Sequence, residues 1–131
     1  MIIGLHHAQI TIPRHAEPLA QEFYCGVLQF VEIPKPENLV SRGGFWMRGG
    51  TLDVHVGTED NVDRLATKAH LAYAVDDLGY WRERLTMAGI ELLDGLPIPG
   101  FDRFEFRDPF GNRVEMIAAL TPPSPPASLR G

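Results

Sequence analysis

The feature that most constrains the fold of this chain is an internal repeat with an offset of 63 residues. His7 and His70 are separated by this offset, and so are Gly26 and Gly89. The same offset relates strand to strand and helix to helix, which a chance match of one short segment does not produce. A repeat of such a long period predicts two equivalent units, each with the element order β-α-β-β-β.

The first unit is predicted over residues 3–57. Polar and apolar residues alternate up to Pro13, as in a strand, and apolar residues at helical spacing follow, with Pro18 suited to the first turn. Later alternating segments are interrupted by Gly49-Gly50, which predicts a tight hairpin turn. The predicted elements are a strand over 3–12, a helix over 16–27 and strands over 30–33, 45–48 and 51–56.

A polar linker is predicted over residues 58–66, and the second unit over residues 67–120. Asp76 is suited to cap a helix and Gly89 to end it. The strongest signal in this unit is a hairpin over residues 103–116, in which two alternating segments flank a turn rich in Asp, Pro, Gly and Asn. The predicted elements are a strand over 70–75, a helix over 78–88, a strand over 90–93 and the two strands of the hairpin.

Composition excludes several classes of partner. The 131 residues suit one domain, and 44% hydrophobic residues are enough for a core. The net charge of -5 without a basic block makes nucleic-acid binding unexpected. The lack of a long apolar segment makes a signal peptide or a membrane span unexpected. Cys25 is the only cysteine, so no intrachain disulfide forms and a cytoplasmic location is expected. The Pro-rich segment 121–131 is predicted to be a disordered tail.

The polar faces of the strands point to a metal site. An amphipathic helix in each unit covers the apolar face of its own strands, so we expect the polar faces of the two half-sheets to line one cup. On this interpretation His7, His70 and Glu115 point inward. Two imidazoles and a carboxylate are ligands for a divalent transition metal, and they leave coordination positions open for water and substrate.

Each of these residues also has a structural interpretation. A single histidine on a strand is more often hydrogen-bonded or half-exposed than a metal ligand, and a strand glutamate is usually solvated. The repeat favours the metal interpretation, because His7 and His70 occupy equivalent positions. His6 is a rival to His7, but its parity places it with the apolar residues of the strand.

Further polar residues are expected beside this site. Asp53 and His55 share a face of their strand, and a turn at Gly49-Gly50 is expected to pair Trp46 with Asp53. Trp46 and Arg48 then face the cup, where Trp46 is suited to stack on an apolar substrate and Arg48 to pair with an acidic one. Simple filling of the cavity is the alternative for Trp46. The residues assigned to substrate binding are Trp46, Arg48, Asp53, His55 and Arg103.

Glu105 is the candidate catalytic residue, because it lies ten residues before Glu115 on the same face. If the hairpin places them opposite each other, the two carboxylates repel unless a cation lies between them. A metal ion, Arg103 or Arg48 could supply that charge. A salt-bridged structural role for Glu105 is favoured, with a role as general base near the metal as the alternative.

At these motifs the chain resembles the vicinal oxygen chelate superfamily, which includes glyoxalases, extradiol dioxygenases, thiol transferases acting on fosfomycin and bleomycin resistance proteins. The resemblance covers residues 3–120 and is most specific over residues 106–115. One departure is Gln29, where many relatives have glycine. The matching segments are 5–12, 23–30, 69–78 and 106–115.

The resemblance implies an α+β fold in which two βαβββ modules form a cupped, barrel-like mixed sheet with the helices outside. It implies a divalent metal, Fe, Mn, Ni, Co or Zn, at His7, His70 and Glu115. In glyoxalase-like members a fourth ligand comes from the last strand of the first module, where this chain has Asp53, with His55 two residues on. Relatives of this size usually dimerise, which implies a homodimer whose modules pair within one chain or across two.

Three functions are compatible with these residues. The first is a metal-dependent enzyme that chelates a small oxygenated molecule and acts as a lyase, an isomerase or a dioxygenase. The second is a metal-free protein that binds a small molecule or an antibiotic, as bleomycin resistance proteins do. The third is a structural or regulatory ligand-binding module without turnover. The enzyme is favoured because all three metal positions carry competent ligands.

Overall fold

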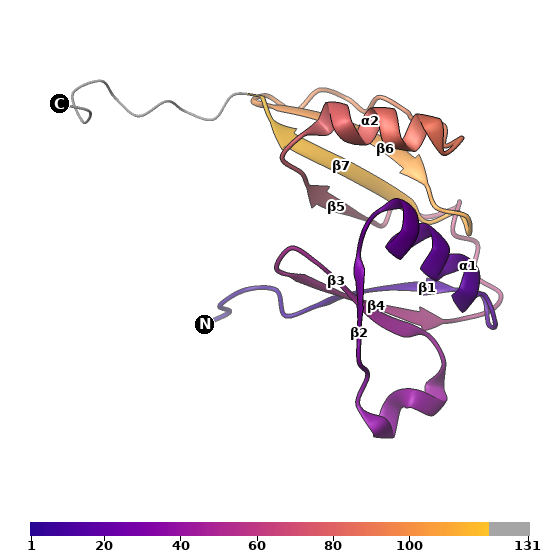
Figure 1. Cartoon of the computed structure of the whole chain (residues 1–131). Helices are drawn as coiled ribbons and strands as arrows, with labels where there is room; N and C mark the ends of the chain where they lie inside the picture. The colour runs from indigo at the N-terminus through magenta and orange to yellow at the C-terminus, as the bar shows by residue number, and fades with distance from the viewer. Residues whose placement is uncertain (121–131) are drawn as a thin grey trace. The chain divides into compact units, whose positions relative to one another are not determined.

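The computed structural model describes residues 1–120, which divide into two units (Figure 1). The first unit comprises residues 1–69 together with 107–113, and the second comprises residues 70–106 and 114–120. Each unit combines one sheet with helical segments, so the predicted α+β class is confirmed. The predicted disordered tail, 121–131, lies outside the described residues.

The first unit is built on a four-stranded sheet. Its strands are β1 (Ala8–Ile12), β2 (Val31–Ile33), β3 (Phe45–Gly49) and β4 (Leu52–Thr58), in the order β1-β4-β3-β2. β1 runs parallel to β4, and the other neighbouring strands are antiparallel. Alternation buries one face of the sheet and leaves the polar face for other contacts. The buried residues of that apolar face include Ile12, Phe45, Met47, Val54 and Val56.

The helix predicted over 16–27 divides into two parts. α1 spans only Glu17–Gln21, with Pro18 in its first turn. Residues Glu22–Val27 form a wider π-helical turn, after which the Leu28 N–H donates to the carbonyl of Phe23 at 3.0 Å. The segment still buries Ala20, Phe23 and Tyr24, so the periodicity identified the buried face although the helix type differs.

Two loops of the first unit depend on unusual backbone angles. Gln29 has a φ of 64°, a left-handed conformation that favours glycine, which is the residue that the family resemblance led us to expect there. The segment after β2 contains a 3-10 helix, Glu37–Arg42. This helix is followed by Gly43 and Gly44, which both have positive φ, and a Cβ on Gly44 would collide with the carbonyl oxygen of Val56.

The second unit is built on a three-stranded sheet and one helix. The strands are β5 (His70–Ala74), β6 (Phe101–Arg107) and β7 (Arg113–Ala119), in the order β5-β7-β6, and the helix is α2 (Leu78–Met87). Within residues 1–120 the strands of the two units therefore form two separate sheets, not one continuous barrel. The core of the second unit includes Leu78, Leu85, Phe104, Phe106, Val114 and Met116.

Local signals around α2 were close to correct. Asp77, not Asp76, is the N-cap, and its Oδ1 accepts a hydrogen bond from the Tyr80 N–H at 3.1 Å. Gly89 follows the helix with a φ of 80°, as its predicted position requires. The predicted strand over 90–93 is reduced to a single bridge between Leu93 and Glu105. No helix in residues 1–120 has the length and apolar character needed to cross a bilayer.

The tip of the β6–β7 hairpin belongs to the first unit. Both carboxylate oxygens of the buried Asp108 accept hydrogen bonds there, including one from the Tyr24 hydroxyl at 2.6 Å and one from Asn112 Nδ2 at 2.8 Å. The backbone N–H groups of Phe110 and Asn112 donate to its other oxygen. Asn112 Nδ2 also donates to the carbonyl of Thr11 at 2.9 Å. The most specific motif of the sequence is therefore a folded turn that joins the first unit.

Candidate functional site

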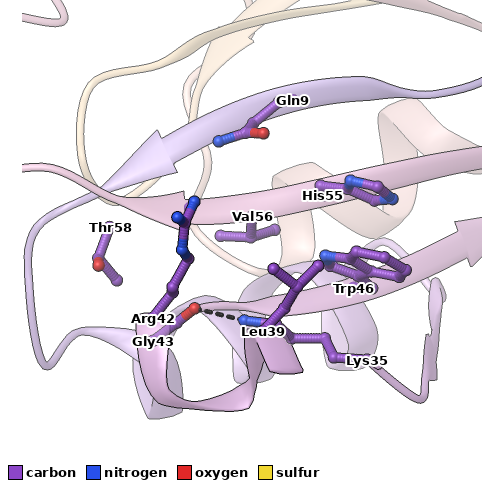
Figure 2. Close-up of a pocket in the computed structure, with 10 residues that line it drawn as sticks. Gln9, Lys35, Leu39, Arg42, Gly43, Trp46, His55, Val56 and Thr58 are labelled. Carbon is purple, nitrogen blue, oxygen red and sulfur yellow. Dashed lines mark hydrogen bonds between the residues drawn. The ribbon is translucent and has the colours of Figure 1, made fainter. Parts of the chain in front are cut away.

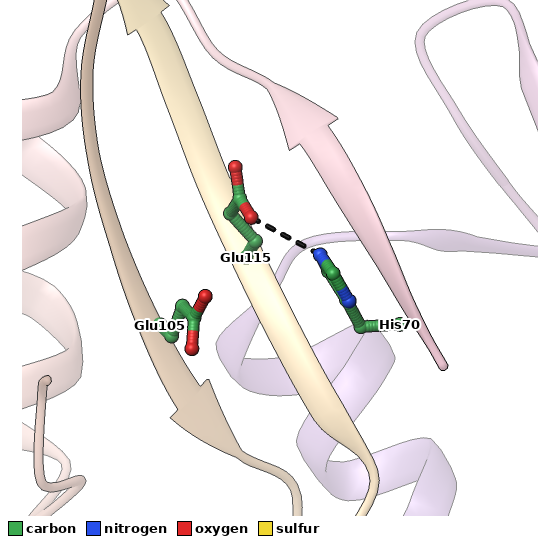
Figure 3. A group of neighbouring side chains, drawn as sticks. All are labelled: His70, Glu105 and Glu115. Atoms are coloured by element: carbon green, nitrogen blue, oxygen red, sulfur yellow. Dashed lines mark hydrogen bonds and ion pairs between the residues drawn. The ribbon is translucent and has the colours of Figure 1, made fainter. Parts of the chain in front are cut away.

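The candidate metal centre lies on the polar face of the three-stranded sheet (Figure 3). One potential ligand atom from each of His70 in β5, Glu105 in β6 and Glu115 in β7 lies within 4.8 Å of the other two. Alternation explains this meeting, because Phe104 and Phe106, the neighbours of Glu105, are buried on the opposite face. The structure thus brings together two of the three predicted metal ligands, His70 and Glu115, with the candidate catalytic residue Glu105.

The spacing of these donors fits a divalent ion. His70 Nε2 lies 3.2 Å from Glu115 Oε1. Two neighbouring ligands, each about 2.1 Å from one ion, are themselves about 3 Å apart, so this separation matches one edge of a coordination shell. An imidazole nitrogen with carboxylate oxygens is also the donor chemistry that first-row divalent metals accept.

Arg103 is the cation that lies between the two carboxylates. Its Nε donates to Glu115 Oε2 at 3.0 Å, and its Nη2 donates to Glu115 Oε1 at 2.8 Å and to Glu105 Oε1 at 2.6 Å. Its Nη1 donates to the carbonyl of Leu96 at 2.8 Å. A Cβ on Gly95 would collide with this guanidinium, so a side chain at position 95 would displace either Arg103 or the loop before β6.

This arrangement keeps Glu115 ionised. The hydrogen bonds and charge of Arg103 lower the pKa of the Glu115 carboxyl below its usual value, against the effect of burial, and His70 contributes in the same direction. Glu115 in turn raises the pKa of Arg103. A Glu115 side chain that is only 5% exposed is therefore a carboxylate ready to accept hydrogen bonds or to coordinate a cation.

The remaining predicted site residues form a second cluster, on the polar face of the first unit. The His55 ring stacks on the Trp46 indole at a centroid distance of 3.8 Å and on the His7 ring at 4.0 Å. His6 Nδ1 lies 2.9 Å from His7 Nδ1. Burial lowers the pKa of His55, and the neighbouring His7 adds to this effect. His55 is thus held as the central ring of a three-ring stack.

The predicted pairing within the β3–β4 hairpin was wrong by two residues. Trp46 lies opposite His55 and Arg48 lies opposite Asp53, whereas Trp46 was expected opposite Asp53. The reason is that Gly49 still pairs with Leu52, so the turn residues are 50 and 51. The four side chains nevertheless share the polar face, as predicted, because a shift of two preserves parity.

Arg48 and Asp53 are engaged with each other. Arg48 Nε donates to Asp53 Oδ1 at 2.6 Å and its Nη2 donates to Asp53 Oδ2 at 3.1 Å. This pair lowers the pKa of Asp53, chiefly through the hydrogen bond from Arg48. Arg48 therefore balances the charge of Asp53, whereas Arg103 balances the charges of Glu105 and Glu115.

A cavity of about 290 Å³ opens beside the ring stack of the first unit (Figure 2). Its lining includes Gln9, Lys35, Leu39, Arg42, Trp46 and His55. Trp46 and His55 were among the predicted site residues, and the others were not. Leu39 and Arg42 were missed because they lie on a 3-10 helix, Glu37–Arg42, that no pattern in the sequence indicates. The available signal was the pair of cationic residues at either end of a loop that leads into the strand of Trp46.

Comparisons with known proteins agree with the fold. The family model for the Glyoxalase/Bleomycin resistance protein/Dioxygenase superfamily matches residues 4–116. A solved Bacillus anthracis structure assigned to the glyoxalase family is 38% identical, with a TM-score of 0.85 over 91% of this chain and 97% of that one. None of the curated proteins matches the chain.

Two structures of the fosfomycin resistance protein FosX from Listeria monocytogenes are also similar. One, in complex with Mn(II) and sulfate, is 19% identical with a TM-score of 0.71, covering 91% of this chain and 92% of that one. A mutant form in complex with Mn(II) and 1S,2S-dihydroxypropylphosphonic acid is 19% identical with a TM-score of 0.75, covering 91% and 94%. At this identity the likeness shows a common fold.

Proposed function

Because this chain belongs to the Glyoxalase/Bleomycin resistance protein/Dioxygenase superfamily, we propose that it is a divalent-metal-dependent enzyme acting on a small oxygenated molecule. The observation that carries the proposal is the convergence of His70, Glu105 and Glu115 donors within 4.8 Å. The proposed chemistry is that of a lyase, an isomerase or a dioxygenase, with the substrate bound through two neighbouring oxygens.

The proposed ligands are His70 Nε2, a Glu115 oxygen and the ring of His7, the repeat mate of His70. His7 is supplied by the same chain or by a second copy in a homodimer. The Mn(II) complexes of FosX support a first-row divalent metal. When bound, such an ion supplies a Lewis acid that stabilises negative charge on adjacent substrate oxygens.

The protein's own side chains then have distinct tasks. Arg103 holds both oxygens of Glu115 and keeps this carboxyl ionised, so its remaining lone pairs stay aimed at His70. Glu105 accepts a hydrogen bond from Arg103 through Oε1, and we propose its carboxylate as the base that takes a substrate proton. A purely structural Glu105 is the alternative, and Glu105→Gln separates the two, because an amide still accepts from Arg103 but takes up no proton.

Metal binding by the purified full-length chain tests the proposal. We expect about one divalent ion per chain by elemental analysis and titration calorimetry, and at least about a tenfold loss of affinity in His70→Asn and Glu115→Gln. His7→Asn is expected to weaken binding similarly. A screen with diol, oxoaldehyde–thiol and epoxide substrates would then identify the reaction.

Two matched substitutions serve as controls. His15 and Glu83 are exposed and lie outside both clusters, so His15→Asn and Glu83→Gln should bind metal as the unaltered protein does. Unchanged metal stoichiometry in both His70→Asn and Glu115→Gln would contradict the ligand assignment.

One observation favours a second candidate function, that of a metal-free protein that binds a small molecule. Arg103 already balances Glu105 and Glu115, so these carboxylates are not left without a cation. A chain that binds small molecules equally well after exhaustive chelation, and that takes up no divalent ion, would support this candidate over the enzyme.

A further inference from the structure

The cavity beside the ring stack carries a charge opposite to that of the chain. The whole chain has a net charge of -5, yet the described residues that line this cavity include Lys35 and Arg42 and no carboxylate. Its volume of about 290 Å³ lies at the small end of the range for pockets that bind small molecules. A small anionic ligand therefore fits both its size and its charge.

The two cations are not equivalent. Lys35 Nζ donates to the carbonyl of Gly43 at 2.7 Å and so ties together the ends of the loop that contains the 3-10 helix (Figure 2). Within residues 1–120 no hydrogen bond or ion pair is found for the Arg42 guanidinium, although it lines the cavity. Lys35 thus holds the loop, and Arg42 offers a planar set of N–H donors suited to a carboxylate or a phosphonate.

The opposite wall of the cavity is flat and apolar. The Trp46 indole is fixed parallel to the His55 ring, with an interplanar angle of 1°, and Leu39 lies on the loop side. Gln9 adds a carboxamide that closely approaches Gly57, where a Cβ would lie 2.5 Å from Gln9 Nε2. His55 alone separates the Trp46 wall from the His7 ring in the stack.

We propose that this cavity binds the anionic end of a small organic acid, which pairs with Arg42 while its apolar part packs on Trp46 and Leu39. This inference rests on the proposed function, because it names the chemical class of the substrate. The His7–His55–Trp46 stack connects the acid-binding cavity to the proposed metal ligand of the same unit.

Binding of model acids to the metal-free, full-length protein tests the inference. The chain has two tryptophans, so Trp81→Phe leaves Trp46 as the only indole reporter. We expect phenylacetate or phenylphosphonate to quench Trp46 fluorescence with a Kd of about 1 mM or below, and the neutral phenylacetamide to bind at least about tenfold more weakly. The tighter of the two acids identifies the preferred anion. Indole N–H signals of the protein with both tryptophans provide the same readout if Trp81→Phe folds poorly.

Arg42→Gln should remove the preference for the acid over the amide, and Arg42→Lys should restore part of it. Arg14→Gln is the matched control, because Arg14 lines a neighbouring cavity that Arg42 also borders and should not alter binding. Equal binding of acid and amide, no saturable binding of either acid, or an equal loss in Arg14→Gln and Arg42→Gln would overturn the proposal.

The same experiment in His70→Asn separates this inference from the proposed function. Retained acid binding in this variant, whose metal affinity is expected to be reduced, supports the anion site even if the catalytic assignment fails. Normal metal stoichiometry in Arg42→Gln, together with a lost preference for the acid, shows that the two sites are independent in their ligands.

Discussion

Arg103 is the residue on which the candidate metal centre depends. It satisfies Glu105, Glu115 and the carbonyl of Leu96 at once, and its side chain is only 10% exposed. Two carboxylates this close repel unless a cation balances them, and removing one member of such a buried network leaves the others unpaired. The salt bridge to Glu105 was expected from the sequence as one of three possibilities, and the structure gives Arg103 as the cation.

The lowered pKa of Glu115 predicts how the metal-free protein responds to acid. A carboxyl whose pKa is lower in the folded state stabilises the fold above its usual value of 4.5, and this contribution is lost as the pH falls through the folded value. We expect the urea midpoint to fall between about pH 6 and about pH 3, and to fall less in Glu115→Gln. Parallel pH curves for the two proteins would contradict this account.

The sequence predicted the side chains that lie on regular strands better than those on loops. Parity alone placed His70, Glu105 and Glu115 on one face, because alternation in a strand is fixed by covalent geometry. Arg42 was missed because it lies at the end of a 3-10 helix, where the direction of a side chain depends on tertiary contacts such as that between Lys35 and Gly43.

At the level of elements, the hairpin between β6 and β7 combines two roles. Its strands carry Glu105 and Glu115, and its turn carries Asp108, whose hydrogen bonds all lie within the first unit. The turn motif supported the family resemblance, although its residues bind no proposed ligand. The turn motif therefore has a structural role in this chain, because its buried Asp108 carboxylate needs several hydrogen-bond donors.

Tyr24→Phe tests how much the hydrogen bond from Tyr24 to Asp108 contributes to stability. The substitution removes the hydroxyl that donates to Asp108 at 2.6 Å and leaves a buried carboxylate with fewer partners. We expect the free energy of unfolding to fall by about 2 kcal/mol in urea or heat denaturation, as for other hydrogen bonds to charged groups. Tyr80→Phe at an exposed position of α2 is the control, and equal stability of the two variants would contradict the role of the bond.

Two differences in the elements have simple physical causes. The β3–β4 register was misjudged because Gly50 has a φ of 58° and so occupies the turn, while Gly49 remains in its strand. The strand predicted over 90–93 ends after one bridge, and the segment that follows contains Pro97 and Pro99, which lack the N–H that a ladder needs. Both effects depend on single residues within otherwise correct patterns.

For the molecule as a whole, the repeat was the most informative signal. It predicted two units of sheet and helix, and both are present in residues 1–120. The repeat is not exact in structure, because the first sheet has four strands and the second has three. The offset fixes which elements correspond, whereas the length of each strand depends on local proline, glycine and packing that differ between the halves.

The placement of the hairpin tip in the first unit has a consequence for dissection of the chain. A truncated protein ending at residue 69 keeps Tyr24 and Thr11 but loses Asp108 and Asn112, so the Tyr24 hydroxyl loses the carboxylate to which it donates. We expect this fragment to melt with low cooperativity and to show poorly dispersed amide signals in NMR spectra. Adding residues 107–113 as a separate peptide is expected to restore neither property fully. A well-dispersed, cooperatively melting fragment would contradict this. Cutting this chain at its linker is therefore not expected to give a first half that folds by itself, because that half takes Asp108 and Asn112 from the second half of the sequence.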